Sequence, residues 1–168
     1  MTLMKLNDCC PNHTKELFDG HDITNFSVYA NDSDDNDQDK VGSVKGVLVD
    51  ETDGHFRYFI VDTGFWVFGK KVLLPVGLAQ LNYDKERLYV AGLTKEQVEN
   101  LPEFSDDLKI DNDYEERVRS AYRPLVLAPT VSSLAGGAYS YQQEPYFYEL
   151  NDPRFRSYQD QLRDRRLA

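Results

Sequence analysis

The chain has 168 residues, of which 40% are hydrophobic and 29% charged, and its formal net charge at pH 7 is −10. This length fits one domain with appendages, or two very small domains. Nucleic-acid backbones and anionic membrane surfaces both repel a strongly negative chain. We therefore expect no nucleic-acid partner, and we expect any contact with a membrane complex to be peripheral.

The N-terminal region is typical of a soluble, cytoplasmic protein. The two cysteines are adjacent, so we expect no disulfide framework. The first residues lack the apolar core of a signal peptide, and no segment approaches the roughly 18 apolar residues of a membrane span. Cys9, Cys10, His13 and His21 carry atoms that bind zinc, but adjacent cysteines are poorly spaced for a tetrahedral site. We expect exposed thiols on a polar arm formed by residues 1–19.

Residues 31–39, NDSDDNDQD, contain five Asp and no apolar residue. Asp32, Asp34 and Asn36 match the first alternating ligands of an EF-hand calcium loop. Two later positions, where such a loop needs Gly and a bidentate Glu, hold Asp and Ser instead. The two interpretations are a solvated loop and a weak divalent-cation site.

Short β-strands separated by close turn signals fill the region after residue 22. Their β-branched and aromatic residues recur at the density of strands, and Asp53-Gly54 supplies a tight reversal. No helical pattern intervenes, which favours a small antiparallel barrel or sandwich over a parallel sheet. The expected strands cover residues 23–30, 40–50, 55–62, 71–76, 78–83 and 87–91.

A short helix is expected directly after the last strand, in the segment LTKEQVENLP at residues 93–102. Thr94 and Gln97 have the spacing of a capping box, and Pro102 stops the helix within two turns. We expect this helix to close one end of the barrel.

Two further helices are expected in the C-terminal part of the chain. Residues 112–123 form the first, which is capped near Asp111 or Asn112 and ended by Pro124. The second begins near Pro153, and the arginines near its end suit the negative end of the helix dipole. The residues between the two helices show no sustained period.

The order of three segments resembles the PRC-barrel family. They are KVGSVKGVLVD, FRYFIVDTGFWVFGKKVLLP and LTKEQVENLPEF, and together they span about half the chain. That family includes the cytoplasmic barrel of the photosynthetic reaction centre and a domain of the ribosome maturation factor. The resemblance implies a compact six-stranded β-barrel that acts through protein contacts and has no common catalytic residue. It divides the chain into an arm (1–19), a PRC-barrel domain (20–104) and a Tyr-rich, partly helical extension (105–168).

Phe65, Trp66 and Phe68 stand between two glycines in the most apolar stretch of the chain. A barrel of this size needs large side chains to fill its interior, and each aromatic buries roughly 150–250 Å². Core filling is the first interpretation of these residues. The second is that some of them lie at the barrel rim and anchor a protein partner, since Trp and Tyr are favoured at binding hot spots.

The C-terminal extension has more aromatic residues than a plain linker needs. Phe155 and Tyr158 fall at helical spacing, and Tyr146 and Tyr148 lie just before that helix. Three interpretations remain: these side chains pack on their own barrel, they bind a second copy of the chain, or they bind another protein. The last two make them partner-binding candidates and favour a homodimer.

No catalytic motif is present in the sequence, and no cofactor is expected. Asp62, beside Thr63, is the one candidate for acid–base work, but an aspartate that ends a strand more often caps a turn. The sequence therefore predicts a non-catalytic adaptor or assembly factor, which the resemblance links to photosynthetic complexes, stress adaptation or ribosome maturation. The alternative is a protein that binds a small ligand or a divalent cation at the barrel mouth or the Asp-rich loop.

Overall fold

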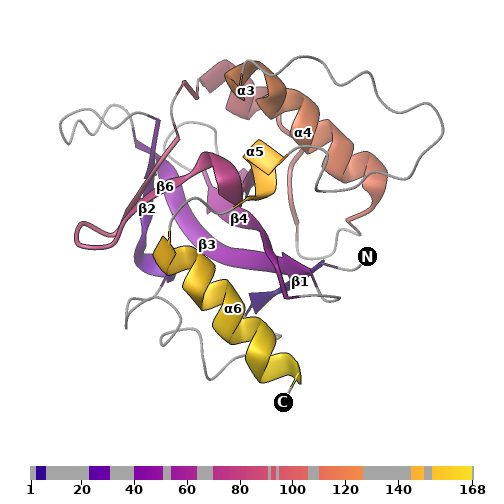
Figure 1. Cartoon of the computed structure of the whole chain (residues 1–168). Helices are drawn as coiled ribbons and strands as arrows, with labels where there is room; N and C mark the ends of the chain where they lie inside the picture. The colour runs from indigo at the N-terminus through magenta and orange to yellow at the C-terminus, as the bar shows by residue number, and fades with distance from the viewer. Residues whose placement is uncertain are drawn as a thin grey trace.

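The computed structural model shows a β-sheet surrounded by helices (Figure 1). The chain is mainly β in its first half, and most of its helices follow after residue 94, as the sequence predicts. The structure describes residues 3–6, 23–30, 40–50, 54–63, 70–90, 92–93, 95–105, 110–126, 145–149 and 153–167.

Seven strands form one sheet in the order β5-β4-β3-β2-β7-β6, and β1 pairs separately with β3. Within the described residues β5 and β6 are not paired with each other, so the sheet is not closed. The strands are β1 (Leu3–Lys5), β2 (Ser27–Tyr29), β3 (Lys40–Asp50), β4 (Phe56–Asp62), β5 (Lys71–Pro75), β6 (Gln80–Asn82) and β7 (Arg87–Tyr89).

The expectation of a purely antiparallel sheet is wrong for one pair of strands. β2 and β7 run parallel, with Ser27 opposite Arg87 and Tyr29 opposite Tyr89. Tight turns fix the direction only of strands that follow each other closely, and β2 and β7 are separated by four other strands. Their direction is therefore set by packing, which the turn signals do not encode.

The longest strand, β3, organises the sheet. It pairs with β4 along most of its length, with β2 near Ser43 and with β1 near Asp50. Its pairing with β4 shifts register at two places, between Val44 and Gly46 and again beside Val49. Such bulges bend a strand and increase its twist, which lets β3 contact three partners.

The reversal between β3 and β4 contains the predicted glycine. Gly54 has a φ of 76°, in the left-handed region that favours glycine, and its N–H donates to the Asp50 carbonyl at 2.8 Å. The Asp50 N–H donates in turn to the His55 carbonyl at 2.8 Å. Residues 51–53 lie outside the described residues.

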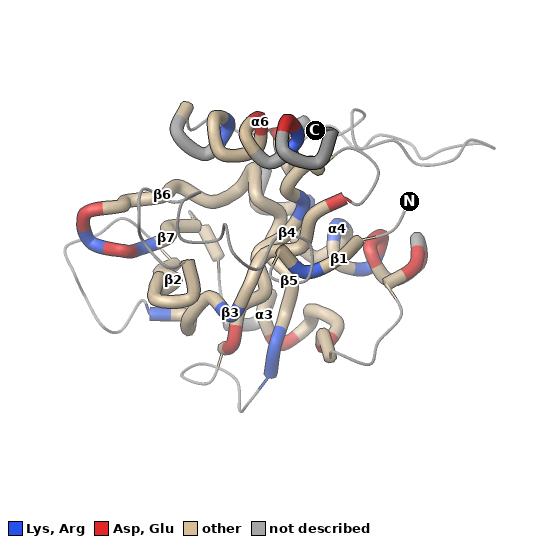
Figure 2. Tube along the Cα trace, turned by 90° about the horizontal axis from the view of Figure 1, so that it is seen from below, with Lys and Arg blue, Asp and Glu red and all other residues tan. Residues whose placement is uncertain are grey.

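The helices are arranged around this sheet. Figure 1 shows α3 and α4 along one side of it and α6 along another, and Figure 2 shows the charged turn between β6 and β7 extending beyond one end of α6. None of the helices in the described ranges has both the length and the apolar character needed to span a membrane. The helical segments are η1 (Ile23–Asn25), η3 (Val76–Leu78), α3 (Lys95–Asn100), α4 (Asn112–Val126), α5 (Pro145–Tyr148) and α6 (Pro153–Leu167).

Helix α4 begins as predicted but ends later. The Asp111 side chain accepts a hydrogen bond from the Tyr114 N–H at 2.8 Å, which confirms the predicted cap. Pro124 does not end the helix, because α4 continues to Val126. Proline removes only one backbone bond when it stands in the last turn, so the helix can run two residues past it.

The 3-10 segments η1 and η3 lie where strands were expected, and one strand and one α-helix of the described residues were not predicted. Strand β1 lies in the segment expected to be a polar arm, and Leu6 directly after it is buried. Helix α5 lies in the segment where no period was recognised. Both are three or four residues long, which is too short for a hydrophobic period to be visible.

One continuous hydrophobic core joins the sheet to the C-terminal helices. It includes residues of every long strand together with Tyr114, Val118 and Tyr122 of α4, Phe147 of α5 and Tyr158 of α6. The extension after residue 105 therefore packs on its own sheet. This is the first of the three interpretations of its aromatic residues.

Candidate functional site

Four buried polar side chains form a cluster between the sheet and the C-terminal helices. Tyr58 comes from β4, Glu115 and Arg119 from α4, and Tyr148 from α5. The Tyr58 hydroxyl donates to Glu115 Oε1 at 2.9 Å and lies 2.6 Å from the Tyr148 hydroxyl. Arg119 donates to the Tyr148 hydroxyl at 3.3 Å. We call these four residues the tyrosine cluster.

Helical spacing on α4 supplies half of this cluster. Glu115 and Arg119 are one turn apart and form an ion pair at 3.9 Å, with Arg119 only 1% exposed. The neighbouring positions Tyr114, Val118 and Tyr122 repeat at the same spacing and are also buried. One face of α4 therefore carries both the apolar contacts and the charged pair into the interior.

The hydrogen bonds of the tyrosine cluster all donate in the same direction along the chain of groups. A hydroxyl has one proton to donate, and that of Tyr58 goes to Glu115. Tyr148 must then donate to Tyr58, and Tyr148 accepts from Arg119. The chain from the Arg119 guanidinium to the Glu115 carboxylate is thus continuous and charge-assisted at both ends.

Burial sets the protonation of both phenols. It raises the pKa of Tyr58 well above 10, and the Tyr148 hydroxyl and the Glu115 carboxylate raise it further. Burial also raises the pKa of Tyr148 to about 12, against an opposing effect of Arg119. Both phenols are therefore protonated at neutral pH. They act as hydrogen-bond donors and are unsuited to nucleophilic or general-base chemistry.

Helix α5 approaches the backbone of η3 closely at Gly77. A Cβ atom at Gly77 would lie 2.5 Å from the Tyr146 carbonyl oxygen and 2.7 Å from the Phe147 carbonyl carbon. Phe147 is fully buried at this contact, and its ring lies 4.7 Å from that of Tyr146. Glycine at position 77 is what allows the two backbones to meet.

Helix α6 is held by different contacts. The Phe56 N–H at the start of β4 donates to the Gln159 side chain at 2.9 Å. Tyr158 packs edge-to-face on Tyr83, with ring centroids 6.2 Å apart. The side chains of Arg156 and Arg163 on this helix are exposed.

A second feature is the closed base of the β4–β5 hairpin. Both the N–H and the hydroxyl of Thr63 donate to the Lys70 carbonyl, each at 2.8 Å. The Lys70 ammonium donates to the carbonyls of Val98 and Glu99 at 3.1 and 2.8 Å, at the C-terminal end of α3. Residues 64–69, which connect Thr63 to Lys70 in the sequence, lie outside the described residues.

The predicted site residues fall into three groups. Tyr148 and Tyr158 are buried within the chain, and Tyr146 is half-buried. Asp62 is half-buried and stands opposite Lys71 in the β4–β5 pair. The side chains of the remaining candidates lie outside the described residues: Phe65, Trp66, Phe68, Phe155, Asp32, Asp34 and Asn36. In the described part of the chain no cluster of His, Cys, Asp or Glu has the makings of a metal site.

Sequence reasoning missed Tyr58, Gly77, Glu115 and Arg119 as a group. The one signal for them was the four-residue spacing of Glu115 and Arg119 on a predicted helix. Nothing local links that pair to a tyrosine in β4 or to a glycine between two strands.

Comparisons with known proteins match the part of the chain that contains strands β2 to β7. Residues 15–97 match the family model of the PRC-barrel domain. An uncharacterized protein of Deinococcus radiodurans is 42% identical over 69 residues, which make up 41% of this chain and 24% of that protein. The family match contains Tyr58 and Gly77, whereas Glu115, Arg119 and Tyr148 lie beyond it.

Proposed function

Residues 15–97 form a PRC-barrel domain, and on this premise we propose that the protein is a non-catalytic adaptor that binds other proteins. Its partner-binding residues are Phe65, Trp66 and Phe68, in the loop between β4 and β5. The alternative is a protein that binds a small ligand or a cation. No contact among the described residues supports this alternative.

The observation that carries this proposal is the closed base of the hairpin. Thr63 and Lys70 are joined by two hydrogen bonds, and Lys70 is tied to the end of α3. A binding loop gains affinity when its ends are held in place, because less conformational freedom is lost on binding. Three of the six positions between Thr63 and Lys70 hold aromatic residues, which are enriched at protein interfaces, and one of them is Trp, a residue favoured at hot spots.

The chemistry of the tyrosine cluster supports a role without catalysis. Its phenols have raised pKa values, and its charged pair is buried between β4, α4 and α5. These groups bind one another, so their role is to hold the C-terminal extension on the sheet. A catalytic group must instead reach a reacting atom.

The proposal includes two finer points. The first is the closed six-stranded barrel of the family as the form of the complete domain; β5 and β6 are unpaired within the described residues, and the register shifts of β3 support curvature of the sheet. The second is that the functional form is a homodimer in the cytoplasm. Light scattering at several protein concentrations tests whether the chain dimerises. The photosynthetic, stress-related and ribosomal settings remain expectations of the family resemblance.

Partner capture with a matched pair of variants tests the adaptor role. Full-length protein, Trp66→Ala and Gln80→Ala serve as baits in a lysate of the source cells, with Gln80 chosen as an exposed residue of β6. We expect Trp66→Ala to lose a defined partner that Gln80→Ala keeps, while both retain the circular dichroism of the wild type. A Trp66→Ala variant that keeps every partner but melts at a much lower temperature would identify Trp66 as a core residue and refute the proposal.

A further inference from the structure

Helix α5 contacts the barrel in the way that a short peptide ligand contacts its receptor. It is four residues long, and Figure 1 shows it in front of the sheet, with α4 on one side and α6 on the other. An isolated helix of this length is unstable in water, so its conformation depends on the surface that holds it. That surface belongs to parts of the chain far away in sequence.

We call this surface the α5 seat and define it by Gly77, Tyr58, Glu115 and Arg119. It recognises three features of the segment PYFY at residues 145–148. Gly77 admits the backbone at Tyr146 and Phe147 to a distance that a Cβ atom would not allow. The interior receives the whole Phe147 side chain, and the tyrosine cluster binds the Tyr148 hydroxyl.

These three features are specific in different ways. The backbone contact selects a turn of a certain shape, because two backbone segments lie against each other with no side chain between them. The buried phenylalanine supplies apolar contact area. The hydroxyl supplies specificity, since a phenylalanine at position 148 leaves the polar groups of Arg119 and Tyr58 facing an apolar ring.

From this geometry we propose that the α5 seat is a peptide-binding site, filled in cis by residues 145–148. The partner that fits it is a protein segment with the same chemistry, an aromatic turn that ends in tyrosine and competes with α5. This site goes beyond the adaptor function of the 64–69 loop and does not depend on it, because it shares no residue with that loop.

Competition from α5 controls the affinity of this site. A tethered segment acts at an effective concentration on the order of millimolar. The apparent affinity for an external peptide is reduced by the fraction of seats that α5 leaves open. Variants that empty the seat therefore bind the peptide more tightly than the wild type does, which is the opposite of the usual effect of deleting contacts.

Peptide binding to full-length variants tests the proposal. The probe is a fluorescein-labelled peptide of residues 143–150, QEPYFYEL, and binding is measured by fluorescence anisotropy. We expect the Phe147→Ala/Tyr148→Ala variant to bind it at least tenfold more tightly than the wild type. Adding Gly77→Ala to that variant is expected to abolish binding, because the new Cβ occupies the space of the peptide backbone. A probe with phenylalanine at the position of Tyr148 is expected to bind at least fivefold more weakly.

Two outcomes overturn the proposal. In the first, the Phe147→Ala/Tyr148→Ala variant is folded but does not bind the probe. In the second, adding Gly77→Ala to that variant leaves probe binding unchanged, which means that the peptide binds at another surface. Should the double variant fail to fold, hydrogen exchange on the wild type replaces it: excess probe is expected to speed exchange at residues 146–148, and unchanged exchange refutes the site. Trp66→Ala is expected to leave probe binding unchanged, so failure of this site and failure of the adaptor function are distinguishable.

Discussion

Replacing Tyr58 with Phe tests whether the tyrosine cluster fastens the C-terminal extension to the sheet. The lost hydroxyl donates to the Glu115 carboxylate at 2.9 Å and lies 2.6 Å from the Tyr148 hydroxyl. Both partners are buried, so water does not replace it freely. Glu115 retains its ion pair with Arg119 at 3.9 Å.

The expected loss of stability follows from these contacts. A hydrogen bond to a charged group contributes about 1.5–3 kcal/mol, and a neutral one about 0.5–1.5 kcal/mol. Losing one of each should lower the free energy of unfolding by about 3 kcal/mol. For a chain of this size, this corresponds to a fall in Tm of roughly 6–12 °C.

The matched control is Tyr122→Phe. Tyr122 is buried as completely, and its hydroxyl donates to the Leu73 carbonyl at 2.8 Å, a bond between neutral groups. We expect a loss of about 1 kcal/mol from this variant. Urea unfolding followed by far-ultraviolet circular dichroism gives both values. Equal losses in the two variants would refute the special role of the cluster.

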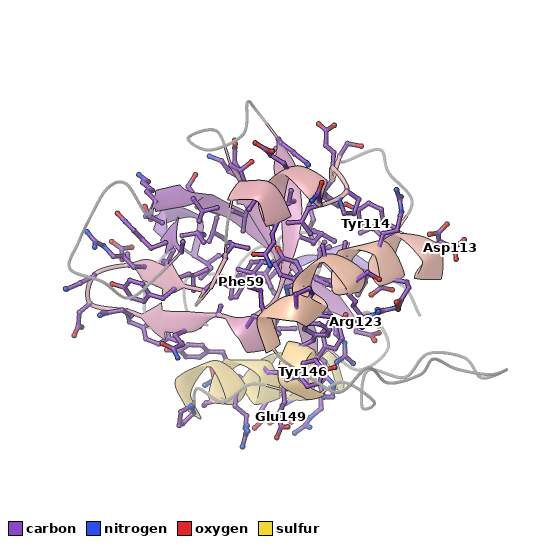
Figure 3. All side chains as sticks on the ribbon, turned by 90° about the horizontal axis from the view of Figure 1, so that it is seen from above. Phe59, Asp113, Tyr114, Arg123, Tyr146 and Glu149 are labelled. Atoms are coloured by element: carbon purple, nitrogen blue, oxygen red, sulfur yellow. The ribbon has the colours of Figure 1, made fainter. Side chains whose placement is uncertain are left out.

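Three single contacts give further predictions. Folding raises the pKa of Tyr148 from 10.0 to about 12. The protonated phenol therefore stabilises the folded state below pH 10, and this stabilisation is lost as the pH rises towards about 12. Over this pH range the Tm of the Tyr148→Phe variant should fall less than that of the wild type. Lys70→Met removes the bonds to the end of α3 and should lower stability by about 1–2 kcal/mol in urea unfolding, while Lys45→Met on an exposed position of β3 should have little effect. Asp111→Ala should cost about 1 kcal/mol by the same measurement, because it removes the cap of α4, whereas Asp113→Ala, whose side chain projects outward in Figure 3, should cost less; equal losses from these two would argue against the cap.

Local patterns in the sequence were sufficient for most of the secondary structure. The strands β3, β4 and β5 were predicted because β-branched and aromatic residues cluster between recognisable turns. The start of α4 was predicted because Asp111 is followed by a helical pattern, and the structure shows the corresponding hydrogen bond. These features depend on residues within one turn or one strand of each other.

Long-range contacts explain what could not be predicted. Glycine is required at position 77 because of the backbone of Phe147, which lies far later in the sequence. The Phe147 carbonyl oxygen would lie only 2.8 Å from a Cβ atom at position 77. Tyr58 lies in the apolar run of the expected strand at residues 55–62, and its sequence neighbours do not reveal that Glu115 faces it. A single sequence carries the residues of such a site but not their pairing.

The outer edge of β5 restricts how two copies of the chain can associate. Its Lys71 carbonyl accepts from the Phe104 N–H at 2.7 Å, and its Leu73 carbonyl accepts from the Tyr122 hydroxyl at 2.8 Å. Pro75, at the end of the strand, has no N–H to donate. These are the devices by which proteins prevent an edge strand from pairing with another chain. A dimer built by joining two sheets would therefore use an edge other than β5, and Tyr122→Phe, which frees the Leu73 carbonyl, is the variant in which new self-association should first appear.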